Sequence, residues 1–211
     1  MYATVRTSFV HPDKIEDAVR IYRQWVAAAA RDEAIAGKQR GLIGVGDRTV
    51  GKGIQIALYD NVEDRAAGAE AVETSSTRSR ATFAISPLRE EFYVFVRAFA
   101  DEVSVDDDGP CARLTIIRAR PDTESVAQVF SVVEETVLAQ LQRQRGHLGY
   151  LGLGDTTSGK TMHLSFWNTE SGLEASESSG NYQNQLARLA DVLAEPPTRE
   201  LFEVTAMRLA G

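Results

Sequence analysis

Alternating apolar and polar residues predict most of the strands in this chain. Between Thr4 and Val10, residues Val5, Thr7 and Phe9 fall on one face and polar side chains fall on the other, because successive side chains of a strand point to opposite faces. The same alternation, helped by β-branched and aromatic residues, predicts the other strands. Their ranges are 42–47, 53–60, 91–99, 113–119, 150–155, 161–168 and 201–209.

Apolar residues at helical spacing predict helices between these strands. A long amphipathic helix is expected from about Asp13 to about Ala36, and a second one carries its apolar stripe from Val126 to Leu141. A weaker, alanine-rich helix is expected at 63–79. The last helix carries an apolar stripe from Tyr182 to Leu193 and is expected to be disturbed around 179–181.

The same order of elements occurs twice along the chain. Glycine, aspartate, threonine and lysine residues of the segment 41–52 recur 108 positions later, in 149–160, which indicates a duplicated unit. Asp106–Pro110 combines three like charges with two residues that break regular structure. The sequence therefore predicts two repeats, 1–105 and 111–211, joined by a linker at 106–110, each with the ferredoxin-like order β-α-β-β-α-β.

The last strand of the first repeat is apolar on both faces. Tyr93, Phe95 and Phe99 alternate with Phe92 and Val94, and apolar patches of that size are rarely left exposed on a monomer. We therefore expect an α+β fold in which the two repeats pack sheet to sheet as a barrel within one chain. The helices would lie outside, with a cavity or a packed core between the sheets.

Composition narrows the classes of function. The formal charge of −7 over 211 residues provides no basic surface, which argues against nucleic acid and against an anionic membrane as partners. Neither a secretory signal nor an apolar run long enough to span a membrane is evident. The single cysteine, Cys111, excludes an intramolecular disulfide and fits a cytoplasmic protein.

One motif suggests nucleotide binding, but its context contradicts that interpretation. Residues 154–161 match the phosphate-loop pattern G-x-x-x-x-G-K-[ST]. A phosphate loop must be followed by a helix, whereas the residues after Lys160 alternate as a strand does. The matching position of the first repeat is Gly53 instead of a hydroxyl residue. A β-hairpin is the better interpretation.

The chain resembles the antibiotic biosynthesis monooxygenase (ABM) superfamily, here as a tandem repeat. The resemblance covers nearly the whole chain and rests on the order of elements, on the glycine-rich strands GLIGVG and GYLGLG, and on the aromatic residues Tyr59 and Trp167 at matching strand ends. It implies a dimeric α+β barrel. The superfamily includes cofactor-independent oxygenases, quinol oxygenases, haem-degrading enzymes and members without known activity, so the fold does not define the reaction.

The haem-degrading branch of the superfamily implies residues that this chain lacks. That branch uses an asparagine on the first strand and a histidine about ten residues after the tryptophan. Here Glu177 stands ten residues after Trp167, Ala69 is its counterpart in the first repeat, and neither first strand contains asparagine. We therefore expect no cofactor and disfavour haem, because iron would lack an axial imidazole.

His163 is the candidate catalytic residue. It shares a strand face with Ser165 and Trp167, and it points between the sheets if the opposite face, with Met162, packs under the helices. A neutral imidazole there could accept a proton from a phenolic or enolic substrate. The alternative is a hydrogen-bonded core histidine. Its counterpart in the first repeat is Gln55, a candidate for substrate binding, so a single half would use this acid–base chemistry.

Further residues are candidates for substrate binding. Trp167 and Tyr59 offer flat walls, although structural packing is the favoured role for them. Arg6 and Arg97 lie among apolar neighbours and could hold an oxyanion or sit at strand ends. The resemblance places three more residues near a pocket mouth. These are Asn168, Asn181 and Tyr182.

Together these features predict a monooxygenase-like protein that acts on a small aromatic or quinol-type compound without a cofactor or metal. The alternative is a non-catalytic module, either a small-ligand carrier or a structural protein. Haem binding or degradation is a weaker alternative. A homodimer of tandem barrels stays open, as does the identity of the substrate.

Overall fold

The structure is a computed structural model that describes residues 1–29, 31, 37–68, 70, 84–99, 103–105, 109–178 and 181–209. Contacts divide the chain into two compact units. Unit 1 comprises Met1–Phe92, Asp101–Asp108 and Glu203–Gly211, and unit 2 comprises Tyr93–Ala100 and Gly109–Phe202.

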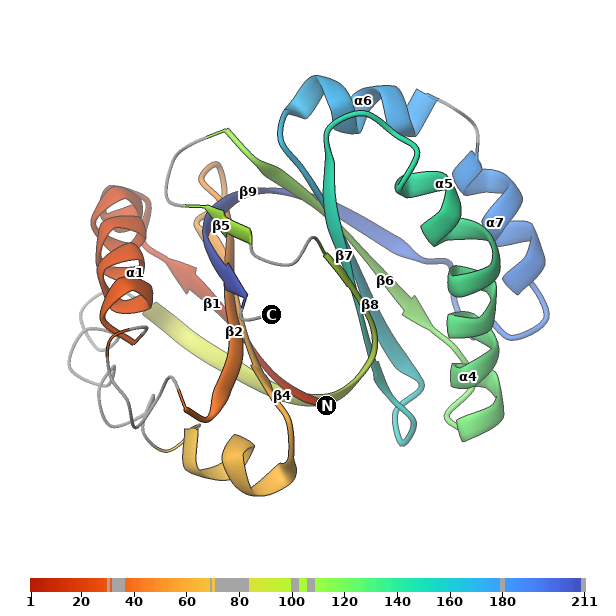
Figure 1. Ribbon diagram of the computed structural model, residues 1–211, viewed down its shortest axis with the longest axis horizontal. Coiled ribbons are helices and arrows are strands. Elements are labelled where there is room, and N and C mark those ends of the chain that lie inside the picture. Colours follow the sequence, from red (N-terminus) through yellow and green to blue (C-terminus); the bar gives the residue numbers. More distant parts are fainter. Residues whose placement is uncertain are drawn as a thin grey trace. The chain divides into compact units, whose positions relative to one another are not determined.

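Unit 1 is an antiparallel sheet with helices against it (Figure 1). Its strands run in the order β5-β9-β2-β3-β1-β4, where β4 and β9 each contribute one end. Residues 62–68 form a further helix. The other elements are β1 (Tyr2–Val10), η1 (Pro12–Lys14), α1 (Ile15–Ala29), β2 (Gln39–Asp47), β3 (Lys52–Tyr59), β4 (Ala84–Phe99), β5 (Val103–Val105) and β9 (Thr198–Leu209).

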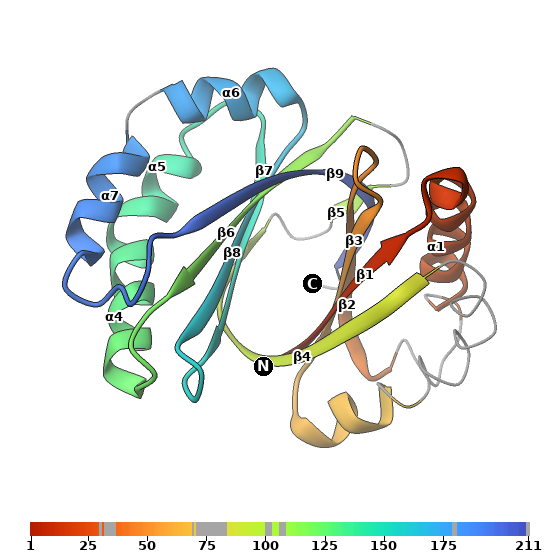
Figure 2. The ribbon, with the colours of Figure 1, turned by 180° about the vertical axis from the view of Figure 1, so that it is seen from behind.

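Unit 2 repeats this plan with the strand order β4-β7-β8-β6-β9. Helices α4, η2 and α5 form one continuous helix with a π-helical stretch in the middle, and they lie beside α7 (Figure 2). The elements are β6 (Cys111–Arg118), α4 (Thr123–Val132), η2 (Val133–Leu138), α5 (Ala139–Leu141), β7 (His147–Asp155), β8 (Lys160–Trp167), α6 (Glu170–Ser178) and α7 (Asn181–Leu189).

The predicted α+β fold class and the repeated β-α-β-β-α-β order are confirmed. The compact units follow the two repeats except at the last strand of each, because β4 and β9 run from one unit into the other. β4 begins at Ala84 and not near Glu91, and the short strand β5 was not predicted. The early start of β4 was not predicted because the strand contains Pro87, and proline is rare inside strands. Residues 106–108 of the linker, 32–36 and 71–80 lie outside the described residues.

Each sheet has one face packed against helices. In unit 2 that face carries Tyr150 and Trp167, which lie in one buried cluster with Val129 and Phe130 of α4. In unit 1 it carries Ala57 and Tyr59, which lie in one cluster with three residues of α1. The opposite faces are buried too, as expected from their apolar character. Their fully buried residues include Ile43, Ile54, Ile56, Leu58, Leu114, Leu151, Leu153, Met162, Leu164 and Phe166.

The β2–β3 and β7–β8 hairpins share one turn structure. Asp47 Oδ1 accepts hydrogen bonds from the Thr49 backbone N–H at 2.8 Å and from the Thr49 hydroxyl at 2.5 Å. Asp155 accepts the same pair of bonds from Thr157 at 2.9 and 2.6 Å. Lys160 starts strand β8 directly after the second turn. The hairpin interpretation of residues 154–161 is therefore confirmed, and no helix follows to receive a phosphate.

Substitution of Gly51 by alanine is expected to destabilise the protein by about 2 kcal/mol. Gly51 has φ +67°, and a Cβ there would lie 2.3 Å from the Val10 carbonyl oxygen. The matched control is Gly53→Ala, because a Cβ at Gly53 would meet Ser8 Oγ at an ordinary 3.6 Å. Urea denaturation of both variants tests this prediction, and equal midpoints would contradict it.

Candidate functional site

A cavity of about 80 Å³ lies in unit 1 between helix α1 and the sheet. Its wall on the helix side is apolar, apart from the Tyr22 hydroxyl, and its sheet side is rich in glycine. Both sides belong to the same compact unit. The lining residues are Ser8, Val10, Ile15, Ala18, Val19, Tyr22, Gly44, Val45, Gly46, Asp47, Arg48, Gly51, Lys52, Gly53, Ile54, Gln55 and Thr205.

Strand register creates the glycine-rich floor of this cavity. Gly53 of β3 pairs with Gly46 of β2, so two adjacent positions on the helix face lack side chains. The Tyr22 ring fills the space above Gly44, where a Cβ would lie 1.9 Å from Tyr22 Cε1. Above Gly53 the nearest atom to a Cβ is Ser8 Oγ at 3.6 Å. The open space therefore lies beside the tyrosine ring, over a flat strand surface.

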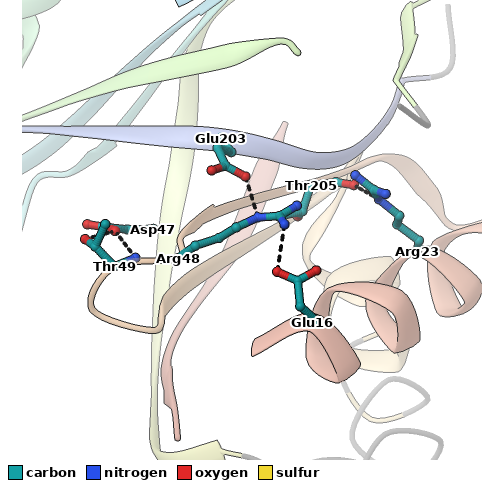
Figure 3. Close-up of polar contacts among 7 residues, drawn as sticks. All are labelled: Glu16, Arg23, Asp47, Arg48, Thr49, Glu203 and Thr205. Carbon is teal, nitrogen blue, oxygen red and sulfur yellow. Dashed lines mark hydrogen bonds and ion pairs between the residues drawn. The ribbon is translucent and has the colours of Figure 1, made fainter. Parts of the chain in front are cut away.

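Polar groups lie at both ends of the cavity. Ser8 and Gln55 are neighbours on the helix face, because Ser8 pairs with Gly53, two residues before Gln55. At the hairpin end, Arg48 bridges two elements (Figure 3): its Nη1 lies 2.7 Å from Glu16 Oε1 of α1, and its Nε lies 2.5 Å from Glu203 Oε2 of β9. The inner end can thus hydrogen bond to a neutral ligand, whereas the hairpin end is charged.

The equivalent space in unit 2 is filled by larger side chains. The register pair that corresponds to Ser8 and Gly53 is Ile117 and Thr161, which are 4% and 0% exposed. The Phe130 ring covers Gly152 and Gly154, and Phe95 stacks on Phe130 with ring centroids 4.2 Å apart. Duplication has therefore produced one unit with a cavity at this position and one with a packed core.

His163 lies in that packed region of unit 2, and both of its ring nitrogens have partners. Its Nε2 lies 2.8 Å from Thr161 Oγ1, and its Nδ1 lies 2.6 Å from the Tyr150 hydroxyl. Thr161 donates to the Ile117 carbonyl oxygen, so His163 Nε2–H donates to Thr161 and the Tyr150 hydroxyl donates to Nδ1. Burial lowers the pKa of His163 to about 3 and raises that of Tyr150. The imidazole is neutral and fully hydrogen bonded.

His163 would point between the sheets only if the β8 face with Met162 packed under the helices, and it does not. Trp167 packs against helix residues, and the face with Met162 is the one away from the helices. His163 and Trp167 therefore face the helix layer, the reverse of the orientation that the catalytic hypothesis required. The alternation of β8 defined which residues share a face, but both faces are buried, so hydrophobicity could not tell them apart. Trp167 is fully buried, and its indole N–H donates to Ser165 Oγ at 3.2 Å.

The structure brings few of the predicted binding residues together. Gln55 lines the unit 1 cavity. Arg6 pairs with Gln55 on β1 and is 5% exposed, but it lies outside the lining. Tyr59 also lies outside the lining; its hydroxyl accepts a hydrogen bond from Gln39 Nε2 at 3.2 Å, and burial raises its pKa.

The other predicted binding residues belong to unit 2. Arg97 pairs with Leu151 on the face away from the helices. Asn168 is exposed, and its backbone N–H donates to the Gly146 carbonyl oxygen at 2.8 Å. Asn181 and Tyr182 begin α7, and their side chains lie outside the described part of the structure. These four residues lie in a different unit from the cavity.

Sequence reasoning missed the small residues that create the cavity. Ser8, Gly53 and Thr205 are unremarkable singly, and Tyr22 was assigned only to the helix stripe. The available signal was the difference between repeats: Ser8 matches Ile117, and Gly53 matches Thr161. Smaller residues at consecutive facing positions of one repeat indicate a cavity there.

Searches for two other kinds of site gave no candidate among the described residues. No group of three or more histidine, cysteine, aspartate or glutamate residues could hold a metal ion there. Within the same residues, no helix has both the length and the apolar character needed to cross a membrane. Cys111 is half-buried, and burial raises its pKa to about 11, so the thiol stays protonated near neutral pH.

Comparison with known proteins supports the fold. No family model and no curated protein match the sequence. A proposed monooxygenase from Fusobacterium nucleatum shares 14% identity at a TM-score of 0.80 over 100% of this chain and 94% of that chain. An anthrone oxidase-like protein shares 14% identity at a TM-score of 0.65, again over 100% and 94%. A heme-degrading enzyme from Listeria monocytogenes shares 8% identity at a TM-score of 0.54 over 96% and 98%. The chain therefore has an ABM-like fold, as its resemblance to that superfamily predicted.

Proposed function

We propose that the cavity of unit 1 binds a small phenolic or quinol-type aromatic molecule. The observation that carries this proposal is the pairing of an open glycine floor with the Tyr22 ring beside it. A flat surface without side chains accepts the face of an aromatic ring, and tyrosine offers offset-stacked or edge contacts to it. Most of the exposed wall surface is apolar, as in typical small-molecule sites.

Ser8 and Gln55 are the proposed anchors of the ligand. A serine hydroxyl donates one hydrogen bond and accepts others, and a glutamine amide provides two donors and an acceptor. A phenolic or quinol hydroxyl is matched by such groups without a charge. The cavity volume of about 80 Å³ holds several water molecules, at roughly 10–15 Å³ each. A cavity that encloses a benzene ring measures about 150 Å³, so a single-ring ligand would fill this half-open cavity and extend to its mouth.

We propose cofactor-independent oxygenation as the reaction class. The structural neighbours described as a proposed monooxygenase and as anthrone oxidase-like support this class. Such a reaction converts an activated CH₂ group and O₂ into a carbonyl group and water, with all electrons and protons from the substrate. It requires a proton acceptor. His163 stays a prediction for that role, and its two hydrogen bonds support a structural role instead.

A specific observation favours the non-catalytic alternative. The cavity lining includes neither an imidazole nor a thiol, and its carboxylate, Asp47, is held by Thr49. The same site would then bind a small aromatic without converting it. Haem fits poorly: a porphyrin is several times larger than this cavity, and Glu177, ten residues after Trp167, pairs with Arg113 and Arg199.

Hydroquinone is expected to quench the fluorescence of Trp25, whose ring stacks on Tyr22 with centroids 5.8 Å apart. Titration of the protein and of a Trp25→Phe variant tests binding, because the variant should lose the response but still bind by calorimetry. An oxygen electrode, with small methylene ketones as substrates, then tests turnover, because hydroquinone has no CH₂ group for the proposed reaction. Binding without oxygen uptake would leave the carrier function. If no calorimetric heat appears with any single-ring phenol, the proposed site is wrong.

A further inference from the structure

We infer that the unit 1 cavity selects uncharged phenols over aromatic acids, and that Glu16 and Glu203 set this preference through Arg48. The inference rests on the proposed function for the identity of the site, and it narrows the class of ligand that the site takes. It also assigns a role to two glutamates that lie outside the cavity lining. All three residues belong to unit 1.

The charged groups of the cavity lie at its hairpin end. Asp47, Arg48 and Lys52 line that end, at the turn between β2 and β3. Gln55 lines the cavity three residues beyond Lys52 on β3, which is about 10 Å along a strand. A ring whose hydroxyl is held at Gln55 therefore directs a substituent on its far side toward the charged groups.

Two glutamates compensate the charge of the Arg48 guanidinium (Figure 3). Glu16 Oε1 of α1 lies 2.7 Å from Arg48 Nη1, and Glu203 Oε2 of β9 lies 2.5 Å from Arg48 Nε. Glu203 stands opposite Gly46 in the β2–β9 pairing, and Gly46 lines the cavity. An arginine in a cavity wall is a common partner of a ligand carboxylate, but here carboxylates of the protein already hold it.

The other charged pair at this end adds no positive charge. The Thr49 hydroxyl donates to Asp47 and holds the pKa of that carboxyl below its usual value, and the charge of Lys52 contributes to the same effect. The Asp47 carboxylate is therefore ionised at neutral pH and offsets Lys52. Around Arg48 and Lys52 there are thus three carboxylates for two cations. A ligand carboxylate would lose its water there without a net positive charge to compensate it.

These charges differ between the repeats in the same way as the cavity does. The aspartate and the lysine of the hairpin occur in both repeats, as Asp155 and Lys160 in unit 2. The three residues of the ion pairs do not recur. Thr156 stands in place of Arg48, Ser125 stands in place of Glu16, and Tyr93 is opposite Gly154 where Glu203 is opposite Gly46. The shared pair therefore accompanies the hairpin, whereas the ion pairs of Arg48 accompany the cavity.

Calorimetric titration with 4-hydroxybenzamide and 4-hydroxybenzoate tests the inference, because the two ligands have nearly the same shape and differ in charge. At neutral pH and low salt, the wild type is expected to bind the amide about tenfold more tightly than the carboxylate. Glu203→Gln should raise the affinity for the carboxylate about fivefold, the upper range for one exposed ion pair, and leave that for the amide unchanged. About 1 M NaCl should reduce this gain.

The matched control is Asp17→Asn, which removes the same charge from α1 beside Glu16. Asp17 pairs with Arg20 within the helix at 2.7 Å, so this variant leaves both carboxylates at Arg48. It should keep the wild-type preference for the amide. Glu203→Gln combined with Arg48→Met should lose the fivefold gain, because the guanidinium that pairs with the ligand carboxylate is gone. An equal gain in Asp17→Asn would overturn the role of Glu203, since net charge alone would then explain it.

Hydroquinone separates this inference from the proposed function, because it carries no charge at neutral pH. If hydroquinone binds the wild type but 4-hydroxybenzoate binds as tightly as 4-hydroxybenzamide, the selection is overturned and the proposed site stands. The same holds if hydroquinone binds and Glu203→Gln leaves the preference for the amide unchanged. If none of the three compounds binds the wild type or Glu203→Gln, the proposed site is wrong and the inference is overturned with it.

Discussion

Acidification from pH 7 to about pH 4.5 is expected to remove about 2 to 3 kcal/mol of folding free energy through His163 alone. Burial lowers the pKa of His163 from 6.5 to about 3 in the folded protein. Between those values the unfolded chain binds a proton that the folded chain does not. Stability is therefore full above about pH 6.5 and falls as pH decreases toward 3.

The comparison of wild type with His163→Gln isolates this effect. Glutamine keeps a donor and an acceptor for Thr161 and Tyr150 but does not titrate. Urea unfolding at several pH values should show a shallower pH dependence in the variant, with a cost at pH 7 of about 1 to 2 kcal/mol. The window above about pH 4.5 avoids Asp47, Asp122 and Asp155, whose pKa values are lowered from 3.8. Identical pH profiles would contradict a neutral, buried imidazole.

His147 adds a smaller contribution of the same sign. Burial lowers its pKa to about 4, and its ring packs edge-on against Trp167 with centroids 5.2 Å apart. It is less buried than His163, so solvent screens it more. The His163→Gln variant should therefore keep a residual pH dependence from His147.

The double substitution Ser8→Ile and Gly53→Thr is expected to weaken hydroquinone binding at least 100-fold, about 3 kcal/mol. It places in unit 1 the residues that fill the matching position of unit 2, Ile117 and Thr161. A Cβ at Gly53 meets Ser8 Oγ at 3.6 Å, so the added groups extend into open space. Because they fill a void, stability should be unchanged or higher.

A matched control for that double variant is Phe9→Thr on the same strand. Phe9 is 45% exposed and lies next to Ser8, with its side chain on the other face. Calorimetric titration should show wild-type affinity for hydroquinone in the control and none in the double variant. Retained affinity in a folded double variant would exclude the cavity as the binding site.

The fold was predictable because its signals are local and repeated. Three patterns each predict their own element: the alternation in β6 and β8, the helix stripe from Val126 to Leu141, and the shared Asp–Thr turns. Because the chain is duplicated, each pattern occurs in two copies that support the same prediction. The exchange of β4 and β9 ends between units was not predictable. It depends on pairing between strands distant in sequence, which no local pattern encodes.

The site was less predictable for two physical reasons. A strand that is buried on both faces gives no sign of which face meets the helices, so the side on which His163 lies could not be predicted. A cavity forms where side chains are small. Neither Gly53 nor Ser8 carries a functional group that marks a binding site in the sequence. Gln55 was the exception, because its equivalence to His163 brought attention to the correct strand.

The central claim is that the ligand site lies in unit 1 between α1 and the glycine floor. A crystal structure of the protein with bound hydroquinone tests it most directly. The ring is expected beside Tyr22 and over Gly53, with a hydroxyl within hydrogen-bond distance of Ser8 or Gln55. Hydroquinone bound against His163 or Trp167 in unit 2, with the unit 1 cavity unoccupied, would contradict the account.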